Sequence, residues 1–256
     1  MTVSYTDLGD GPAVVFLHGV GSAKEGWRQQ IETIVNAGFR FLAIDAPGFG
    51  ETPLPEKPGF APHVGAVIEC LDQLNIEKAF ICGHSLGGMT AQEIYAAHPD
   101  RVMGLILSAT SPAFGRADGG FQKQFIAERM KPFDDGLTMP QFATAFAPRL
   151  LGSNASEDAV NELVEVMSQV SIEAYKLAML TITGFDQRAN LPNIDVPTLL
   201  ISGDEDRNSP APMMAKMASK IAGSDYVELL QTGHMAPVEN SATFNQHLSE
   251  FLRKHV

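Results

Sequence analysis

The chain has 256 residues, of which 45% are hydrophobic, so it is long enough to bury the core of one large domain or of a domain with an insertion. Its formal net charge of −12 disfavours nucleic acids and anionic membranes as partners, because phosphate groups bind basic patches and the chain has no run of Lys or Arg. The N-terminal residues carry no targeting pattern, and the early apolar run at 13–17 is too short to span a bilayer, so we expect a cytoplasmic protein.

Short apolar runs bounded by turn residues predict strands at 13–17, 39–44, 79–82, 102–107, 196–201 and 225–230. The runs are continuous rather than alternating, which is typical of strands buried on both faces of a parallel sheet. Between them, apolar residues share one helical face in segments 27–35, 64–74, 213–221 and 244–252. This alternation predicts an α/β fold with a doubly wound sheet and right-handed crossovers.

One region, residues 112–186, interrupts the alternation with helix-like stretches at 121–130, 139–150, 157–169 and 172–183 and no convincing strand. We therefore predict a core domain of residues 1–111 and 187–256 with a helical cap at 112–186. Phenylalanines are frequent in this cap, and they either form its own core or line an apolar substrate pocket. Phe114, Phe142 and Phe146 are our predicted substrate contacts.

The sequence GHSLG at residues 83–87 has the pattern G-x-S-x-G, and it separates a predicted strand from a predicted helix at 86–97. At such a sharp turn Ser85 is forced into a strained backbone conformation with its side chain above the sheet, and the positions two before and two after must be small. The helix start supplies a free N–H at Leu86 for a developing oxyanion. The setting favours a nucleophile over an ordinary loop serine.

A second backbone donor is expected at the end of the strand at 13–17. An oxyanion hole needs two donors that face each other, and a loop that contains glycine lets the Val20 N–H approach closely. We predict Val20 and Leu86 as the oxyanion hole and Gly19 as a further substrate contact. His18, directly before this glycine, suits packing and local hydrogen bonding better than proton transfer.

Two later strand ends carry an acid and a base. Asp204, Glu205 and Asp206 follow one predicted strand, and His234 follows the next. The carboxyl ends of parallel strands meet at one edge of the sheet, where Ser85 also emerges, so we expect these residues to converge. A serine hydroxyl needs a histidine to accept its proton, and the histidine needs a carboxylate to fix its tautomer.

With these motifs the sequence resembles the α/β-hydrolase family over essentially its whole length. The resemblance rests on FLHG at 16–19, DAPGFG at 45–50, GHSLGG at 83–88, GDED at 203–206 and GH at 233–234. It implies the α/β-hydrolase fold, with a mostly parallel doubly wound sheet and the cap inserted after strand six. It also implies Asp206 as the acid, because family members carry the acid at the third residue after the glycine of this loop, here Gly203. The family's alternative position falls at 107–111, where no carboxylate occurs. Residues 2–6 match the family's second strand, so we expect a seven-stranded sheet without the usual first strand.

The resemblance implies acyl transfer by Ser85, Asp206 and His234 on a small-molecule substrate, with no metal and no organic cofactor. The chain is most similar to 3-oxoadipate enol-lactonases and carboxylesterases, which predicts hydrolysis of a carboxylic ester or lactone. Three alternatives stay open. They are a carbon–carbon bond hydrolase for ring-fission products, a cofactor-free perhydrolase and a ligand-sensing, receptor-like protein. Arg116, Arg129 and Arg149 are the candidates for a carboxylate-binding residue in the first of these, although surface roles are the simpler interpretation.

Three further expectations concern residues outside the proposed catalytic set. Cys70 and Cys82, the only cysteines, lie in apolar segments and are predicted to be reduced core thiols. Glu239 is expected to form local hydrogen bonds or to face solvent, and Asp186 and Arg188 to form a salt bridge.

Overall fold

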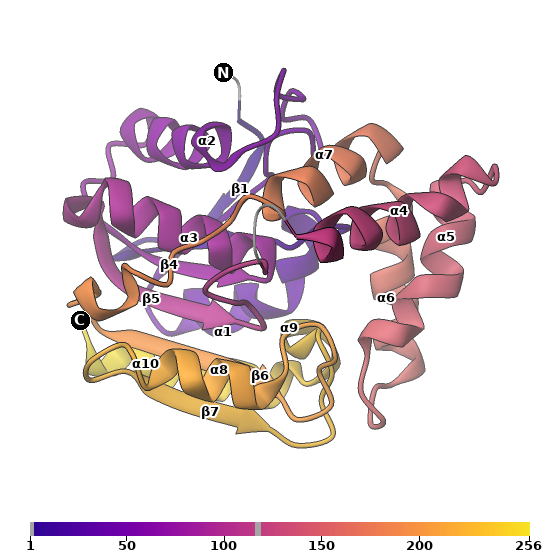
Figure 1. The fold of residues 1–256 in the computed structure, drawn as a ribbon. Coiled ribbons are helices and arrows are strands. Elements are labelled where there is room, and N and C mark those ends of the chain that lie inside the picture. The colour runs from indigo at the N-terminus through magenta and orange to yellow at the C-terminus, as the bar shows by residue number, and fades with distance from the viewer. Residues whose placement is uncertain (1–2, 116–118) are drawn as a thin grey trace.

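A computed structural model describes residues 3–115 and 119–256 of the chain (Figure 1). Its strands are β1 Tyr5–Leu8, β2 Ala13–Leu17, β3 Arg40–Ile44, β4 Ala79–His84, β5 Val102–Ser108, β6 Thr198–Gly203 and β7 Asp225–Leu229. They form one seven-stranded sheet in the order β1-β3-β2-β4-β5-β6-β7. Only the edge pair β1 and β3 is antiparallel among the pairings of the described strands, which confirms the predicted mostly parallel sheet of seven strands. Thr2 and Arg116 lie outside the described residues.

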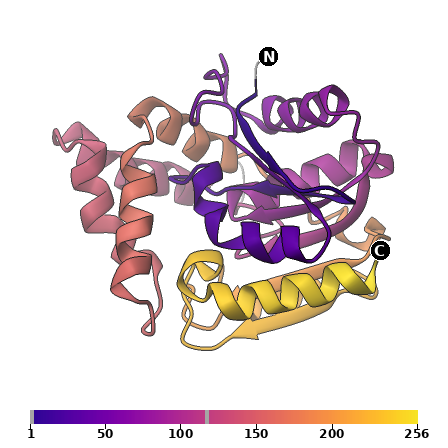
Figure 2. The same cartoon turned by 180° about the vertical axis from the view of Figure 1, so that it is seen from behind.

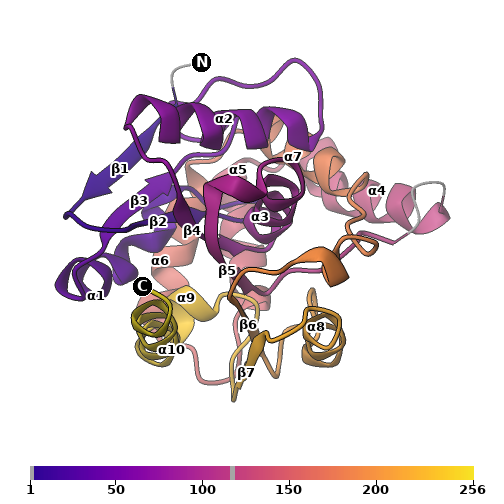
Figure 3. The ribbon, with the colours of Figure 1, turned by 90° about the vertical axis from the view of Figure 1, so that its left-hand side faces the viewer.

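Helices cover both faces of this sheet (Figure 3). Helices α2 Phe60–Gln73, α3 Leu86–Ala97 and α8 Ala211–Ala218 lie on one face, and α1 Ile31–Asn36 and α10 Ser241–Lys254 lie on the other, which Figure 2 turns toward the viewer. Neighbouring strand residues point to opposite faces, so Val15 packs with the first group and Val14 with the second. The sheet is therefore buried on both faces, as its continuous apolar runs predicted.

In the part of the chain that the structure describes, four α-helices lie between β5 and β6, to one side of the sheet (Figure 1). They are α4 Gly120–Asp134, α5 Met139–Phe146, α6 Glu157–Ser168 and α7 Ile172–Ile182, with the 3₁₀ helix η3 Ala147–Leu150 after α5. We call this segment the helical insertion. Its apolar residues form a cluster of their own, which Leu86 and Met89 of the core join. A bridge between Ala113 and Asp186 closes the base of the insertion.

The remaining elements connect these layers. The 3₁₀ helix η1 Lys24–Gln30 precedes α1, η2 Pro99–Arg101 follows α3, η4 Leu191–Asn193 precedes β6 and α9 Ala236–Glu239 precedes α10. Among the described residues, no helix combines the length and apolarity needed to cross a membrane. Both cysteines are buried and free, as predicted.

Several element boundaries differ from the predicted ranges, and proline explains the start of β6. β6 begins at Thr198 rather than at residue 196, because Pro197 has no N–H to donate to the ladder and contributes only its carbonyl, to Leu105. Helix α2 begins at Phe60, four residues before the predicted helical segment at 64–74. Pro62 lies in the first turn of α2, where an N–H would have no helical partner.

Candidate active site

Ser85 occupies the turn between β4 and α3 with φ 53° and ψ −114°, a conformation that residues other than glycine rarely adopt. A side chain at Gly83 would collide with the backbone of Gly87, and one at Gly87 would collide with the carbonyl of Leu17. The two glycines therefore let the strand, the turn and the helix approach within backbone contact. This is the strained turn that the G-x-S-x-G pattern predicted, and Ser85 at its centre is half-buried.

Hydrogen bonds to the end of β5 hold this turn in place. The Ser85 N–H donates to the Ser108 carbonyl at 2.9 Å, and the Thr110 hydroxyl donates to the Ser85 carbonyl at 2.8 Å. The Met89 N–H donates to the same carbonyl at 3.1 Å, which fixes the first turn of α3. The strained backbone is thus fixed from both sides.

His234 lies beside Asp206, and their Nδ1 and Oδ2 atoms are 2.8 Å apart. The other carboxylate oxygen accepts the N–H groups of Asn208 and Ser209 at 2.7 and 3.0 Å. Burial raises the pKa of Asp206, but the imidazole of His234 and these backbone donors outweigh burial and hold the pKa below its ordinary value. Because the carboxylate can only accept, Nδ1 carries the proton and Nε2 of His234 is left as a proton acceptor.

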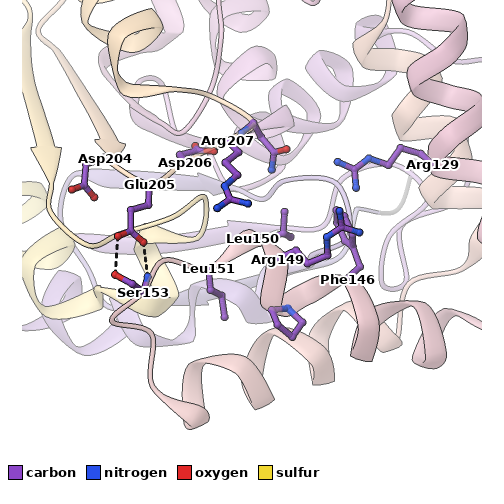
Figure 4. Close-up of a pocket in the computed structure, with 12 residues that line it drawn as sticks. Arg129, Phe146, Arg149, Leu150, Leu151, Ser153, Asp204, Glu205, Asp206 and Arg207 are labelled. Atoms are coloured by element: carbon purple, nitrogen blue, oxygen red, sulfur yellow. Dashed lines mark hydrogen bonds between the residues drawn. The ribbon is translucent and has the colours of Figure 1, made fainter.

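The other two acids after β6 have different partners. Asp204 accepts the Thr232 N–H at 3.1 Å. Glu205 accepts the N–H and the hydroxyl of Ser153 at 2.6 and 2.7 Å (Figure 4). Among the acids of this loop, Asp206 alone contacts His234.

Ser85 and His234 line one cavity with a volume of about 340 Å³. Apolar side chains of the helical insertion form much of its wall, and they include Phe114, Phe121, Phe125, Phe146, Leu150, Met179 and Ile182. The structure thus brings two of the predicted substrate contacts, Phe114 and Phe146, to the serine.

The other two predicted substrate contacts lie outside this cavity. Phe142 is buried in the insertion's own core, where the centre of its ring lies 4.8 Å from the ring centre of Phe133 and 5.5 Å from that of Tyr175. Gly19 does not line the cavity, and a Cβ at this position would stand 2.9 Å from Nδ1 of His84 and 3.1 Å from the Ser85 Cβ. The absence of a side chain at Gly19 therefore lets the loop after β2 approach the turn at Ser85 closely, and Gly19 makes no contact with the cavity.

Val20 and Leu86 are the two predicted backbone donors. Val20 lines the cavity, and Leu86 is the first residue of α3. Within the described part of the chain, no acceptor engages the N–H of either residue. Both amides are thus unpaired donors in the described part of the chain.

A sequence model of the alpha/beta hydrolase fold matches residues 12–241. The chain belongs to the α/β-hydrolase family. The 3-oxoadipate enol-lactonase 2 of Acinetobacter baylyi is 28% identical over 262 residues, covering 99% of this chain and 94% of the relative. The 2-hydroxy-6-oxononadienedioate/2-hydroxy-6-oxononatrienedioate hydrolase of Klebsiella pneumoniae is also 28% identical, over 270 residues, covering 99% and 92%. The crystal structure of the enol-lactonase from Burkholderia xenovorans LB400 has a TM-score of 0.87 and 26% identity, covering 98% of this chain and 96% of that chain.

These comparisons confirm the predicted family and the resemblance to 3-oxoadipate enol-lactonase. The full-length coverage means that the sheet and the helical insertion both have counterparts in the relatives. The two named relatives act on different compounds at the same identity, so family membership alone leaves the substrate of this α/β-hydrolase open.

In this α/β-hydrolase, sequence reasoning missed the residues that hold the backbone around His234. The carboxylate of Glu239 accepts the N–H groups of Gly233 and Met235 at 3.0 and 2.9 Å, and that of Gly152 in the insertion at 2.5 Å. Glu239 thus fixes both neighbours of His234. Its spacing from His234 suggested only local hydrogen bonds, which are present, but not the link to the insertion.

The peptide of His234 itself is held from two sides. Its N–H donates to the Leu150 carbonyl of the insertion at 2.7 Å, and its carbonyl accepts Nε2–H of His84 at 2.7 Å. Burial, and then the neighbouring His234, lower the pKa of His84 to about 3, so His84 is a neutral donor. His84 occupies a variable position of the G-x-S-x-G pattern, so the pattern gave no signal for this role.

His18 has the structural surroundings that its position suggested. Nε2 accepts the Ala46 N–H at 3.0 Å, and Nδ1 donates to the Gly19 carbonyl at 2.9 Å. Burial lowers the pKa of His18, which keeps the ring neutral in this loop. Among the described residues, no group of three or more His, Cys, Asp or Glu side chains is arranged to hold a metal ion.

Proposed function

We propose that this α/β-hydrolase cleaves a small-molecule carboxylic ester or lactone through an acyl-serine intermediate. The observation that carries the proposal is the hydrogen bond between Asp206 and His234, on an imidazole that opens into the same cavity as Ser85. The resemblance to the enol-lactonases supports the same bond type.

In the proposed mechanism, Ser85 Oγ attacks the substrate carbonyl while Nε2 of His234 takes the hydroxyl proton. The N–H groups of Val20 and Leu86 stabilise the oxyanion. His234 then passes its proton to the departing alkoxide oxygen, which leaves an ester on Ser85. Water attacks this ester while His234 takes a proton from the water, and His234 then returns that proton to Ser85 Oγ as the bond to the serine breaks and the acid product departs. Asp206 stays ionised throughout and stabilises the imidazolium.

The helical insertion would act as a cap over the substrate. Its phenylalanines and Leu150 give the cavity an apolar wall, which suits a hydrocarbon part of an ester or lactone. Exclusion of water by this wall strengthens the interaction between the oxyanion and its two donors.

Carbon–carbon bond hydrolysis by the same residues is the second candidate. It is supported by the hydrolase of 2-hydroxy-6-oxononadienedioate, which is as similar to this chain as the lactonase. The two candidates differ in the substrate that the cavity accepts rather than in the residues proposed for catalysis.

The test compares the wild type with Ser85→Ala on esters, lactones, enol-lactones and vinylogous diketones, with proton release as the readout. Ester or lactone turnover that Ser85→Ala abolishes is the expected result. Ser219→Ala, at an exposed serine on the sheet domain, is the matched control and should retain full activity. Turnover of the diketones alone would favour the second candidate, and equal rates with Ser85→Ala would exclude Ser85 as the nucleophile. A fluorophosphonate adduct at Ser85, detected by mass spectrometry, would report the nucleophile independently of the substrate.

A further inference from the structure

The loop after β2 is held at both ends by one short segment of the chain. We call this loop, residues 18–24, the donor loop. At its start, Nε2 of His18 accepts the Ala46 N–H at 3.0 Å. At its end, the N–H of Lys24 donates to Oδ1 of Asp45 at 2.9 Å, and the ammonium of Lys24 donates to Oδ2 at 2.7 Å. Two neighbouring residues after β3 therefore anchor both ends of the donor loop.

Between its ends, the donor loop has no hydrogen bond to another segment of the described chain. Residues 19–23 form hydrogen bonds only among themselves, with His18 and with the start of η1. Val20 belongs to this stretch. A Cβ at Gly19 would stand 3.1 Å from the Ser85 Cβ, so the donor loop lies against the turn that carries Ser85. The place of the Val20 N–H relative to Ser85 thus depends on where the two ends are held.

The anchor at Asp45 is fixed on all sides. Its side chain is completely buried, and Gly50 closes over it, because a Cβ at Gly50 would collide with the carboxylate. The Asp45 N–H donates to the Ser4 carbonyl at 2.9 Å, and the Asp45 carbonyl accepts the Thr52 hydroxyl at 3.0 Å. The carboxylate therefore stays in place if the donor loop moves.

Lys24 supplies both hydrogen bonds that the Asp45 carboxylate accepts from the described residues. A second partner of the ammonium, Glu25, lies 3.0 Å away and is exposed. Burial lowers the pKa of Lys24, but the hydrogen bonds and charges of Asp45 and Glu25 outweigh burial and raise it, so the ammonium is charged at neutral pH. A buried carboxylate without a counterion is strongly disfavoured, so loss of the ammonium would force Asp45 to take up a proton or to turn away.

We propose that Lys24 is a positioning residue for the oxyanion hole, because its ion pair with Asp45 holds the Val20 N–H against Ser85. The inference rests on the proposed function, in which Val20 and Leu86 stabilise the oxyanion. Leu86 directly follows the serine at the start of α3, so the chain itself sets its alignment. Val20 comes from a separate loop and needs tertiary contacts for the same purpose. A charge-assisted hydrogen bond suits this task, since it is stronger than a neutral one.

The first test replaces Lys24 by Met, which keeps an aliphatic side chain and removes the charge. Loss of one oxyanion donor costs about 100- to 1000-fold in kcat. The N–H of residue 24 still holds part of the loop in the variant, so the loss should be smaller. We expect Lys24→Met to lower kcat on p-nitrophenyl butyrate about tenfold or more, with little change in KM.

A thionoester reports on the oxyanion hole itself. In this analogue of p-nitrophenyl butyrate, sulfur replaces the carbonyl oxygen, and sulfur is a weak hydrogen-bond acceptor. The two donors therefore favour the oxygen ester, and the wild type should hydrolyse it with the higher kcat/KM. Lys24→Met should reduce this oxygen-to-sulfur ratio several-fold. A variant that merely unfolds more easily lowers both rates together and leaves the ratio unchanged.

Arg40→Met is the matched control. Arg40 and Asp7 form a partly exposed ion pair at 2.6 Å at the start of β3, whereas Asp45 follows the end of the same strand. Both substitutions thus remove a cation from an ion pair beside one strand, but only Lys24 belongs to the donor loop. Arg40→Met should lower the resistance to urea and leave kcat and the oxygen-to-sulfur ratio unchanged.

Chemical rescue returns the charge at this one position. In Lys24→Cys, the thiolate sulfur can displace bromide from 2-bromoethylamine, which forms a C–S bond and gives a side chain of nearly the length of lysine. The two native cysteines are buried, and the same treatment of the wild type is the control. The aminoethylated protein should recover most of kcat and of the oxygen-to-sulfur ratio. Alkylation with iodoacetamide, which adds a neutral group, should recover neither.

The outcomes separate this inference from the proposed function. A Lys24→Met enzyme with an unchanged oxygen-to-sulfur ratio would overturn the inference and leave the hydrolase proposal standing. If the wild type turned over neither ester, the rate of fluorophosphonate reaction at Ser85 would carry the test, since the phosphoryl oxygen also gains negative charge beside the two donors. A slower reaction in Lys24→Met that aminoethylation of Lys24→Cys restores would support the positioning role, and equal rates would exclude it. A wild type inert to the esters and to the fluorophosphonate would overturn both proposals.

Discussion

Replacement of Glu239 by Gln tests whether the backbone around His234 is positioned by one buried carboxylate. One oxygen of Glu239 accepts the N–H groups of Gly152 and Gly233, and the other accepts that of Met235. A glutamine amide has only one acceptor oxygen, so its NH₂ group must face at least one of these donors. The substitution changes no volume in the cavity, because Glu239 is not among the residues that line it.

The expected change in stability is small for two opposing reasons. A lost hydrogen bond that leaves a buried donor unpaired costs roughly 1–3 kcal/mol. Burial raises the pKa of Glu239 despite its three donors, so its ionised form is destabilised in the fold and the neutral amide avoids that penalty. We expect Glu239→Gln to lower the free energy of unfolding by about 1–2 kcal/mol at neutral pH. Because the pKa of Glu239 is raised in the fold, its contribution to the free energy of unfolding is greatest when the pH lies below the ordinary pKa of 4.5. This contribution falls as the pH rises through the pKa of Glu239 in the folded protein. The difference between wild type and variant should therefore be larger at acidic pH.

The expected change in rate is larger than the change in stability. A displacement of His234 by a fraction of an ångström to 1 Å would lower kcat by roughly 10- to 100-fold, since proton transfer depends on its alignment with Ser85. KM should change little. Steady-state kinetics on an ester and urea unfolding monitored by circular dichroism measure the two effects on the same preparation.

Two further variants make this result interpretable. Glu250→Gln, at an exposed glutamate on α10, should change stability by less than about 0.5 kcal/mol and leave kcat intact. Glu239→Asp keeps the charge and should recover part of the lost rate. A Glu239→Gln enzyme with lowered stability but unchanged kcat would refute the positioning role, and an enzyme unchanged in both would show that these hydrogen bonds contribute nothing.

Three other predictions concern the site and its walls. Asp206→Asn should lower kcat by roughly 10⁴-fold, because the asparagine no longer fixes the tautomer of the His234 imidazole. The pKa of Asp206 is lowered in the fold, so the wild type loses stability as pH falls below about 4. The variant should lack this pH-dependent stability, which acid unfolding would measure. Gly19→Ala should lower kcat about tenfold or more with little change in KM, because the new Cβ would press against Ser85, and stopped-flow acylation kinetics would detect it. Phe142→Ala should lower the free energy of unfolding by about 3–5 kcal/mol, whereas Phe146→Ala should mainly raise KM, and equal effects of the two on KM would contradict the cavity assignment.

Local sequence signals predicted the sheet and the convergence at its edge because each depends on a few adjacent residues. The strained turn at Ser85 is encoded by its two glycines, and the strand ends are encoded by continuous apolar runs that stop at turn residues. The choice of Asp206 over Asp204 required the family pattern, since three consecutive acids look alike until the turn after β6 aims one of them at His234.

The lining of the cavity could not be read from the sequence. Phe142 and Phe146 are four residues apart on α5, so they share one helical face and their rings stack 5.0 Å apart. Periodicity assigns both to the same apolar face, and only the packing of α4 and α7 decides which ring is covered and which is exposed to the cavity. Arg207 gave no signal either, because it lines the cavity at Ser85 only through the packing of the insertion against the loop after β6.

The segment that joins η3 to α6 ties the helical insertion to both loops that carry the proposed acid and base. The carbonyl of Leu150 accepts the N–H of His234, Gly152 donates to Glu239, and Ser153 binds Glu205 next to Asp206. Gly152 and Gly233 also approach so closely that a Cβ at either would collide with the other's loop. This part of the insertion therefore cannot swing away from the sheet without breaking the hydrogen bonds that position His234. The segment at 150–153 is therefore a fixed support for His234.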